Sequence, residues 1–177
     1  IAKTEAARGI WSAAEQPLNA PARGMVKVDV IAAGICGTDY HIYSWDSWSA
    51  GRIKTPMTIG HEFVGRISAI GEGVTSYEIG DRVSAECHIA CGECHFCRTG
   101  NAHICEKTSI IGVDRPGAFA EEVEVPASNL WRVPDAIPDT HAAVFDPVGN
   151  AMHMVSTAKV TAKNVLIVGG GPIGLFA

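Results

Sequence analysis

The sequence predicts a β-rich α+β domain followed by the beginning of an α/β domain with a parallel sheet. Short segments of alternating apolar and polar residues, separated by glycine turns, fill the first 135 residues. The apolar spacing becomes helical after Pro138, and a continuous apolar run then leads into a glycine-rich motif near the last residues. We therefore expect one domain over residues 1–150 and the start of a second over 151–177.

The first domain is expected to contain short strands and few helices. Four segments have the alternation of strands and are bounded by turn residues: 25–32, 62–70, 82–85 and 119–125. Thr38 and Asp39 resemble the start of a short helix that continues to Tyr43.

The second part of the chain has a different period. Residues 139–156 have mostly helical spacing, and Pro147 is expected to break or restart that helix. Residues 164–168 are continuously apolar, as expected of a strand buried in a parallel sheet. The chain then enters a G-x-G-x-x-G motif, and Leu175 is expected to open the following helix.

This glycine motif favours dinucleotide binding. Glycine allows the backbone to approach a pyrophosphate, and the N–H groups at the start of the next helix bind it. The candidate cofactor-binding residues are Gly169, Gly171, Ile173 and Gly174. The alternative is a glycine-rich turn in a plain α/β domain. The acidic residue that would read the ribose is expected about 20 residues further on, beyond the chain, so the sequence leaves NAD and NADP open.

Composition restricts the partners. The 177 residues carry a net charge of −5 without any basic block, which disfavours nucleic acid and anionic membranes. Apolar runs are too short to span a bilayer. Six cysteines that metal binding can explain predict a reducing, cytoplasmic environment. The chain begins with Ile1 and ends inside a motif, so we expect a piece of a longer polypeptide that is inactive alone.

Four cysteines near the middle of the chain have the spacing of a metal site. They form the pattern C-x2-C-x2-C-x7-C, as Cys91, Cys94, Cys97 and Cys105. Tetrahedral zinc needs four ligands about 2.3 Å from one centre, and this short loop supplies them. No position remains for substrate, so we interpret the site as structural Zn2+ in a lobe over 87–108.

Three other interpretations of these cysteines compete with structural zinc. A disulfide framework is disfavoured because crowded C-x-x-C pairs suit metals better. An iron–sulfur cluster is disfavoured because the last gap has seven residues and Glu106, not proline, follows. His95 or His103 could replace one cysteine as a ligand, but four thiolates make this unnecessary.

A second constellation suits an open zinc site. Cys36, His61 and Glu62 combine a thiolate, an imidazole and a carboxylate, all next to glycines. Each residue by itself is ordinary, because a single cysteine is more often a small core residue and a histidine beside a strand is often a satisfied core histidine. The spacing alone leaves both readings open.

The segment G-H-E-F-V-G-R-I-S-A-I-G-E-G-V, which begins at Gly60, resembles the signature of zinc-containing medium-chain alcohol dehydrogenases. The four-cysteine spacing and the motif at 169–174 match the same family in the same order. The resemblance implies a GroES-like catalytic domain followed by a Rossmann domain that binds NAD. It also implies one catalytic and one structural zinc ion.

Two further segments, 41–48 and 145–151, resemble the threonine dehydrogenase branch of that family. This implies oxidation of the secondary hydroxyl of L-threonine to a ketone with NAD, in a homotetramer when intact. Polyol or other secondary-alcohol dehydrogenases are the alternative. The branch pattern makes Cys36, His61 and Glu62 the expected catalytic zinc ligands. Asp146 is expected either to bind zinc or to orient its ligands.

The family pattern also assigns a proton path. Zinc acidifies the substrate hydroxyl, Thr38 takes the proton, His41 relays it outward, and hydride passes to the nicotinamide. Residues three apart on a helical turn share a face. Two non-enzymatic alternatives are a zinc-stabilised binding module and a zinc-ribbon nucleic-acid binder. The binding module is disfavoured because it would not need all five expected catalytic residues, which are Cys36, Thr38, His41, His61 and Glu62. The nucleic-acid binder is disfavoured by the excess of acidic residues.

Overall fold

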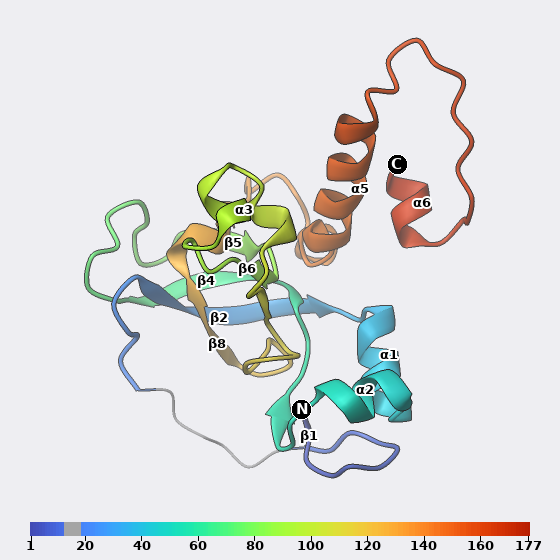
Figure 1. Cartoon of the computed structure of the whole chain (residues 1–177). Helices are drawn as coiled ribbons and strands as arrows, with labels where there is room; N and C mark the ends of the chain where they lie inside the picture. The colour runs from blue at the N-terminus through green and yellow to red at the C-terminus, as the bar shows by residue number, and fades with distance from the viewer. Residues whose placement is uncertain (13–18) are drawn as a thin grey trace.

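The computed structural model describes residues 1–12 and 19–177, and its centre is a five-stranded antiparallel sheet (Figure 1). The strand order is β8-β2-β4-β5-β9, and two short ladders, β1-β3 and β6-β7, lie outside it. The predicted β-rich domain with few helices is confirmed. The strands are β1 (Ala2–Lys3), β2 (Met25–Gly34), β3 (Met57–Thr58), β4 (Glu62–Ile70), β5 (Arg82–Ala85), β6 (His88–Ile89), β7 (Ser109–Ile110), β8 (Glu122–Pro126) and β9 (Leu130–Arg132).

The helices are short apart from one. They are α1 (Gly37–Ser44), α2 (Ser47–Arg52), α3 (His95–Arg98), α4 (Asp139–Ala142), α5 (Phe145–Ala158) and α6 (Pro172–Phe176), with 3-10 turns η1 (Ala102–Ile104) and η2 (Ala127–Asn129). Figure 1 shows α1 and α2 beside one end of β2. The helix α5 leads away from the sheet, and α6 lies beside α5.

Three of the four predicted strands agree closely with the structure. The strands β4 and β5 have the predicted bounds, and β2 continues two residues further, to Gly34. The fourth begins at Glu122 instead of Phe119. Phe119 belongs to a different contact, because its N–H bonds to the Ile59 carbonyl at 2.9 Å and its ring packs over Gly60.

The first residues of β4 are buried from both sides. Phe63 belongs to the main core beneath the sheet, together with Val26 and Val28 of β2. Val64 points to the other face and packs against Val133 and the α4 segment. Because side chains alternate along a strand, both faces must be covered for four consecutive residues to be buried here. This places the beginning of β4 deep inside the domain.

The helix predicted from Thr38 starts earlier than expected. Its N-cap is Cys36, whose backbone N–H donates to the Asp39 carboxylate at 2.9 Å. The sequence pattern pointed to Thr38 as the cap because cysteine is not a typical capping residue. The cap therefore lies two residues before Thr38, which places Cys36 at the junction of β2 and α1.

The single helix predicted over 139–156 is two helices. The first ends at Ala142 and the second begins at Phe145, so the break precedes Pro147. Pro147 lies in the first turn of α5, where a missing N–H costs no helical hydrogen bond. The proline restarts the helix, which was one of the two expected outcomes.

The buried strand predicted over 164–168 is not formed. No strand is assigned there, and Leu166 and Val168 are 86% and 89% exposed. A parallel strand needs a neighbour for its N–H and C=O groups, and none of the described strands pairs with this segment. The helix after it begins at Pro172 rather than at Leu175, because proline at the first helical position has the required φ.

Among the described residues, no helix has the length and apolar character needed to cross a membrane.

Replacement of Gly65 by alanine should destabilise the domain by about 1–3 kcal/mol. The new Cβ would lie 2.2 Å from the Asp29 carbonyl oxygen and 2.6 Å from Val28 Cγ1, inside the β2–β4 pairing. The urea midpoint of the zinc-loaded chain measures the effect. The control is Gly51→Ala in α2, where a Cβ meets nothing within 4 Å and stability should not fall. Equal midpoints for both variants would contradict the packing argument.

Candidate catalytic and structural metal centres

Cys36, His61 and Glu62 converge at one end of the sheet. One potential ligand atom from each lies within 4.8 Å of the others. Cys36 follows β2, His61 directly precedes β4, and Glu62 is the first residue of β4. The β2–β4 register places Gly34 opposite Glu62. A Cβ on Gly34 would lie 2.5 Å from Glu62 Oε2, so a larger residue there would shift this carboxylate from its position. The structure thus brings the three predicted residues together.

Asp39 is a member of this site that the sequence analysis missed. Its Oδ2 accepts the Cys36 N–H, and its Oδ1 lies 4.0 Å from His61 Nδ1. Both Asp39 Oδ1 and His61 Nδ1 are buried without a hydrogen-bond partner. A histidine that binds a metal usually directs its other nitrogen at a carboxylate, which fixes the ring orientation. The available signal was Asp39 three residues after Cys36, a capping-box spacing.

Burial and neighbouring groups raise the pKa values of three ionisable side chains in this cluster. Burial raises the pKa of Asp39, and burial likewise raises the pKa of Glu62. Burial opposes a charged imidazole, yet the contact with Cys36 and the charge of Asp39 raise the pKa of His61. Buried carboxylates that hold protons in this way would release them to a divalent cation. The donor set therefore fits a zinc ion.

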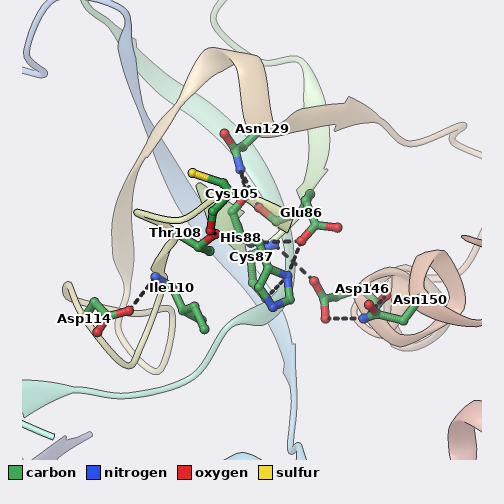
Figure 2. Close-up of polar contacts among 10 residues, drawn as sticks. All are labelled: Glu86, Cys87, His88, Cys105, Thr108, Ile110, Asp114, Asn129, Asp146 and Asn150. Atoms are coloured by element: carbon green, nitrogen blue, oxygen red, sulfur yellow. Dashed lines mark hydrogen bonds and ion pairs between the residues drawn. The ribbon is translucent and has the colours of Figure 1, made fainter. Parts of the chain in front are cut away.

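Asp146 lies in the first turn of α5 and faces the segment Glu86 to His88 (Figure 2). Its Oδ1 accepts the Cys87 N–H at 3.1 Å, and its Oδ2 lies 3.3 Å from Asn150 Nδ2. Burial raises the pKa of Asp146. It is grouped with Glu86, Cys87 and His88 instead of with Cys36, although its charge affects His61 and Glu62. Hydrogen bonds already engage both of its oxygens.

Glu86, Cys87, His88 and Asp146 form a second polar group with potential ligand atoms within 4.8 Å. Glu86 Oε1 and His88 Nδ1 lie 2.6 Å apart, and this contact raises the pKa of His88. Burial strongly raises the pKa of the Cys87 thiol, which stays protonated. Cys87 is therefore a buried free thiol. These groups satisfy one another, so the arrangement does not require a metal.

Figure 2 also shows how this segment is held. The Asn129 side chain donates to the carbonyls of Glu86 and His88 at 2.9 and 3.0 Å. The backbone carbonyl of Asn129 accepts the Glu86 N–H at 2.9 Å. Together with the Asp146 contact, these bonds fix the backbone between β5 and β6.

Thr38 and His41 lie on α1, next to Cys36. Thr38 Oγ1 is 3.7 Å from Cys36 Sγ, so the hydroxyl borders the three-residue cluster. His41 is one turn further along, and its Nδ1 lies 2.6 Å from Asp46 Oδ2. The His41 side chain is 57% exposed. The pair thus extends from the buried cluster towards solvent.

Cys91, Cys94, Cys97 and Cys105 form a separate cluster of free thiols, all within 4.8 Å. The sulfur atoms of Cys94 and Cys97 lie 3.5 Å apart, and two other pairs lie 3.9 Å apart. Four sulfurs bound at about 2.3 Å to one tetrahedral centre stand about 3.8 Å from each other. The geometry therefore matches a closed zinc site.

Backbone N–H groups prepare these sulfurs for negative charge. Cys91 N and Lys107 N each lie 3.3 Å from Cys105 Sγ, and chiefly the first lowers the pKa of Cys105 to about 6. Burial, with contacts from neighbouring thiols, raises the pKa of Cys97 to about 12. Four crowded thiols cannot all ionise without a cation, and zinc would supply the missing charge.

The glycine motif forms a tight loop before α6. Gly169 has φ of +108°, and a Cβ on Gly174 would lie 2.0 Å from the Gly169 carbonyl oxygen. Gly171 is the N-cap of α6, and Ile173 lies in its first turn. Two of the predicted glycines are therefore required by the loop itself. Its role in binding a dinucleotide stays a prediction.

Known proteins share this arrangement. The family model of the alcohol dehydrogenase GroES-like domain matches residues 22–135. The L-threonine 3-dehydrogenases of Stenotrophomonas maltophilia and Edwardsiella ictaluri are 54% and 47% identical over all 177 residues. The alignment covers 52% of each, so the chain spans about half the length of these curated relatives.

Solved structures are similar over almost the whole chain. Galactitol-1-phosphate dehydrogenase from Escherichia coli is 30% identical with a TM-score of 0.88, covering 98% of this chain and 49% of that one. The Escherichia coli alcohol dehydrogenase rspB, solved with NADH, is 38% identical with a TM-score of 0.85, covering 96% and 49%. With this sheet and these metal-binding clusters, the chain belongs to the zinc-dependent medium-chain alcohol dehydrogenase family and carries its GroES-like domain.

Proposed function

We propose that this chain is the catalytic part of a zinc-dependent dehydrogenase that oxidises L-threonine to 2-amino-3-oxobutanoate with NAD. The observation that carries the proposal is the buried cluster of Cys36, His61 and Glu62, in which His61 Nδ1 and Asp39 Oδ1 lack partners. The choice of threonine is supported by relatives named L-threonine 3-dehydrogenase that align over the whole chain.

Cys36, His61 and Glu62 would hold the catalytic zinc ion, which as a Lewis acid makes a nearby alcohol hydroxyl more acidic. Asp39 would keep the proton of His61 on Nδ1, so that Nε2 is free to bind the metal. His61 and Glu62 are each 4% exposed, while Cys36 is half-buried, so the metal side of the cluster is largely shielded from solvent. Exclusion of water strengthens the electrostatic interactions inside the site.

Thr38 and His41 would move the hydroxyl proton. Thr38 Oγ1 borders the cluster, accepts the proton of the substrate hydroxyl and passes its own towards His41. His41 is exposed and can deliver the proton to water. NAD, when bound, would supply the oxidant: it would take the hydrogen of the substrate carbon with its two electrons, which balances oxidation of the alcohol to a ketone.

Asp146 would act as a positioning residue. Its bond to the Cys87 N–H ties α5 to the segment that leads into the four-cysteine lobe. Its charge lies close enough to His61 and Glu62 to influence both. We place it beside the catalytic ligands, one contact away from the metal.

A second candidate is a polyol dehydrogenase, which the likeness to galactitol-1-phosphate dehydrogenase favours. The full-length enzyme that carries this chain should be tested with L-threonine, sorbitol and 2,3-butanediol, with NADH formation as the readout. We expect the highest kcat/KM for threonine. A preference for sorbitol would support the second candidate, and no turnover of any alcohol would support a non-catalytic zinc module. We further propose that the enzyme is cytoplasmic, because its six cysteines are free thiols. We also propose that the intact enzyme is a homotetramer.

Metal analysis of the protein should find about two zinc ions per chain. The four-cysteine site should be harder to strip with a chelator, because it is closed and all-thiolate. Cys105→Ser should lose one zinc ion and lower the unfolding temperature. Cys87→Ser changes a buried thiol that belongs to neither of the two proposed zinc sites, so this variant should retain both ions. A fully loaded protein without zinc at the four cysteines would contradict the assignment.

His41→Ala in the full-length enzyme should lower turnover by about 10²–10⁴-fold, because a general acid–base group is lost. Zinc content should stay the same, since His41 is not a ligand. The loss should shrink at high pH, where hydroxide can take the proton. His141→Ala, at an exposed histidine of α4, is the matched control and should leave turnover unchanged. Unchanged turnover of the His41 variant at neutral pH would remove the relay.

Asp146→Asn should lower turnover by about 10–100-fold while zinc content stays constant. Asparagine preserves size but removes the charge near His61 and Glu62. Asn150→Ala, which removes the partner of Oδ2 and a bond to the Asp146 backbone carbonyl, should have a smaller effect in the same direction. Loss of one zinc ion in Asp146→Asn would instead make Asp146 a ligand. Full activity with full zinc would exclude both roles.

A further inference from the structure

The corner between α1 and α2 pairs His41 with an acidic residue to which neither the sequence analysis nor the proposed mechanism gives a role. Trp45, in a left-handed conformation with φ of 54°, ends α1, and Asp46 is the N-cap of α2. The turn brings Asp46 Oδ2 to 2.6 Å from His41 Nδ1. The two residues are only five positions apart, but they belong to different helices.

The two oxygens of Asp46 have separate partners. Oδ1 accepts the Ser49 backbone N–H at 2.9 Å and caps α2, while Oδ2 faces His41. The Ser49 N–H, followed by the His41 contact, lowers the pKa of Asp46. The carboxylate is therefore ionised at neutral pH and can only accept hydrogen bonds.

An acceptor at 2.6 Å dictates the tautomer of a neutral imidazole. The proton must lie on Nδ1, and the lone pair is then on Nε2. A proton relay needs such a lone pair, because the incoming proton must have a vacant nitrogen to bind. When Nε2 accepts the proton, the resulting imidazolium has the Asp46 carboxylate beside it. The exposed ring can then release a proton to water.

Neighbouring groups hold the pair in place. Ser49 Oγ donates to the His41 carbonyl at 3.0 Å, which ties α2 to α1. The Trp48 and Tyr40 rings lie 6.2 and 6.5 Å from the His41 ring, both in edge-on arrangements. The orientation of the imidazole is thus set by the corner as a whole.

We propose that Asp46 is a positioning residue for proton transfer, which holds His41 with its proton on Nδ1 and leaves Nε2 as the acceptor. This rests on the proposed function, because it presumes that His41 carries the proton of an alcohol. Asp46 touches neither substrate nor metal ligands and acts only through the imidazole.

Two variants of Asp46 separate this role from helix capping. Asn and Ser both cap helices well, so Asp46→Asn and Asp46→Ser should keep α2. With its oxygen on the Ser49 N–H, the asparagine directs its amide N–H at His41 Nδ1. That donor forces the ring proton onto Nε2 and blocks the acceptor. Serine leaves His41 without a fixed partner.

The first measurement is the ¹⁵N chemical shifts of histidine in the folded, zinc-loaded chain. We expect a protonated Nδ1 on His41 in the unsubstituted protein and a protonated Nε2 in Asp46→Asn. The second measurement is turnover of the full-length enzyme, which should fall about 10–100-fold in Asp46→Asn and less in Asp46→Ser. Zinc content should not change. Asp135→Asn removes an exposed acid that pairs with Arg66 and should alter neither readout.

Two results would overturn the proposal: a protonated Nε2 in the unsubstituted protein, or a reversed tautomer in Asp46→Asn with unchanged turnover. Failure of the proposed function is distinguishable from both. In that case the unsubstituted enzyme oxidises none of the alcohols, which removes the catalytic meaning of the pair, while the nitrogen shifts still report whether Asp46 sets the tautomer.

Discussion

The antiparallel pairing of β2 with β4 is the constraint on which the rest of the structure depends. Its register sets Gly34 opposite Glu62, and the chain then turns at Cys36 into α1. A shift by one residue would send Glu62 to the opposite face of the sheet and separate it from Cys36. A Cβ at Gly34 would displace the Glu62 carboxylate from its position. The register of this strand pair therefore sets the relative positions of Cys36 and Glu62.

Two neighbouring polar clusters show why ligand-type residues alone do not make a metal site. In the group of Glu86, Cys87 and His88, the side chains bond to each other, and burial keeps the thiol protonated. In the group that contains His61, a ring nitrogen and the facing Asp39 oxygen are buried without partners. Unsatisfied buried polar atoms are costly, and a cation on the far side of the ring would draw this pair together. The two clusters therefore differ in whether their buried polar atoms have hydrogen-bond partners, and not in the types of residue they contain.

The segment from Glu86 to His88 connects the two metal centres mechanically. It follows β5, leads into the four-cysteine lobe, and is fixed by Asn129 on one side and Asp146 on the other. Asp146 in turn lies at the start of α5, the longest helix. The backbone that leads into the four-cysteine lobe therefore also bonds to Asp146, near the proposed catalytic cluster. In the proposed function, the four-cysteine site would in this way support the geometry of the catalytic one.

The sequence by itself determined the features that are local. The four-cysteine cluster spans 15 residues, so its spacing was enough, and alternation was enough for the bounds of β4 and β5. It did not find the contact of Asp39 with His61 or that of Asp46 with His41, because these depend on helix starts and register, which periodicity does not encode. The apolar run at 164–168 has the pattern of a strand, but none of the described strands pairs with it. Only tertiary structure decides such cases, because a strand and a ligand set are completed by partners from elsewhere in the chain.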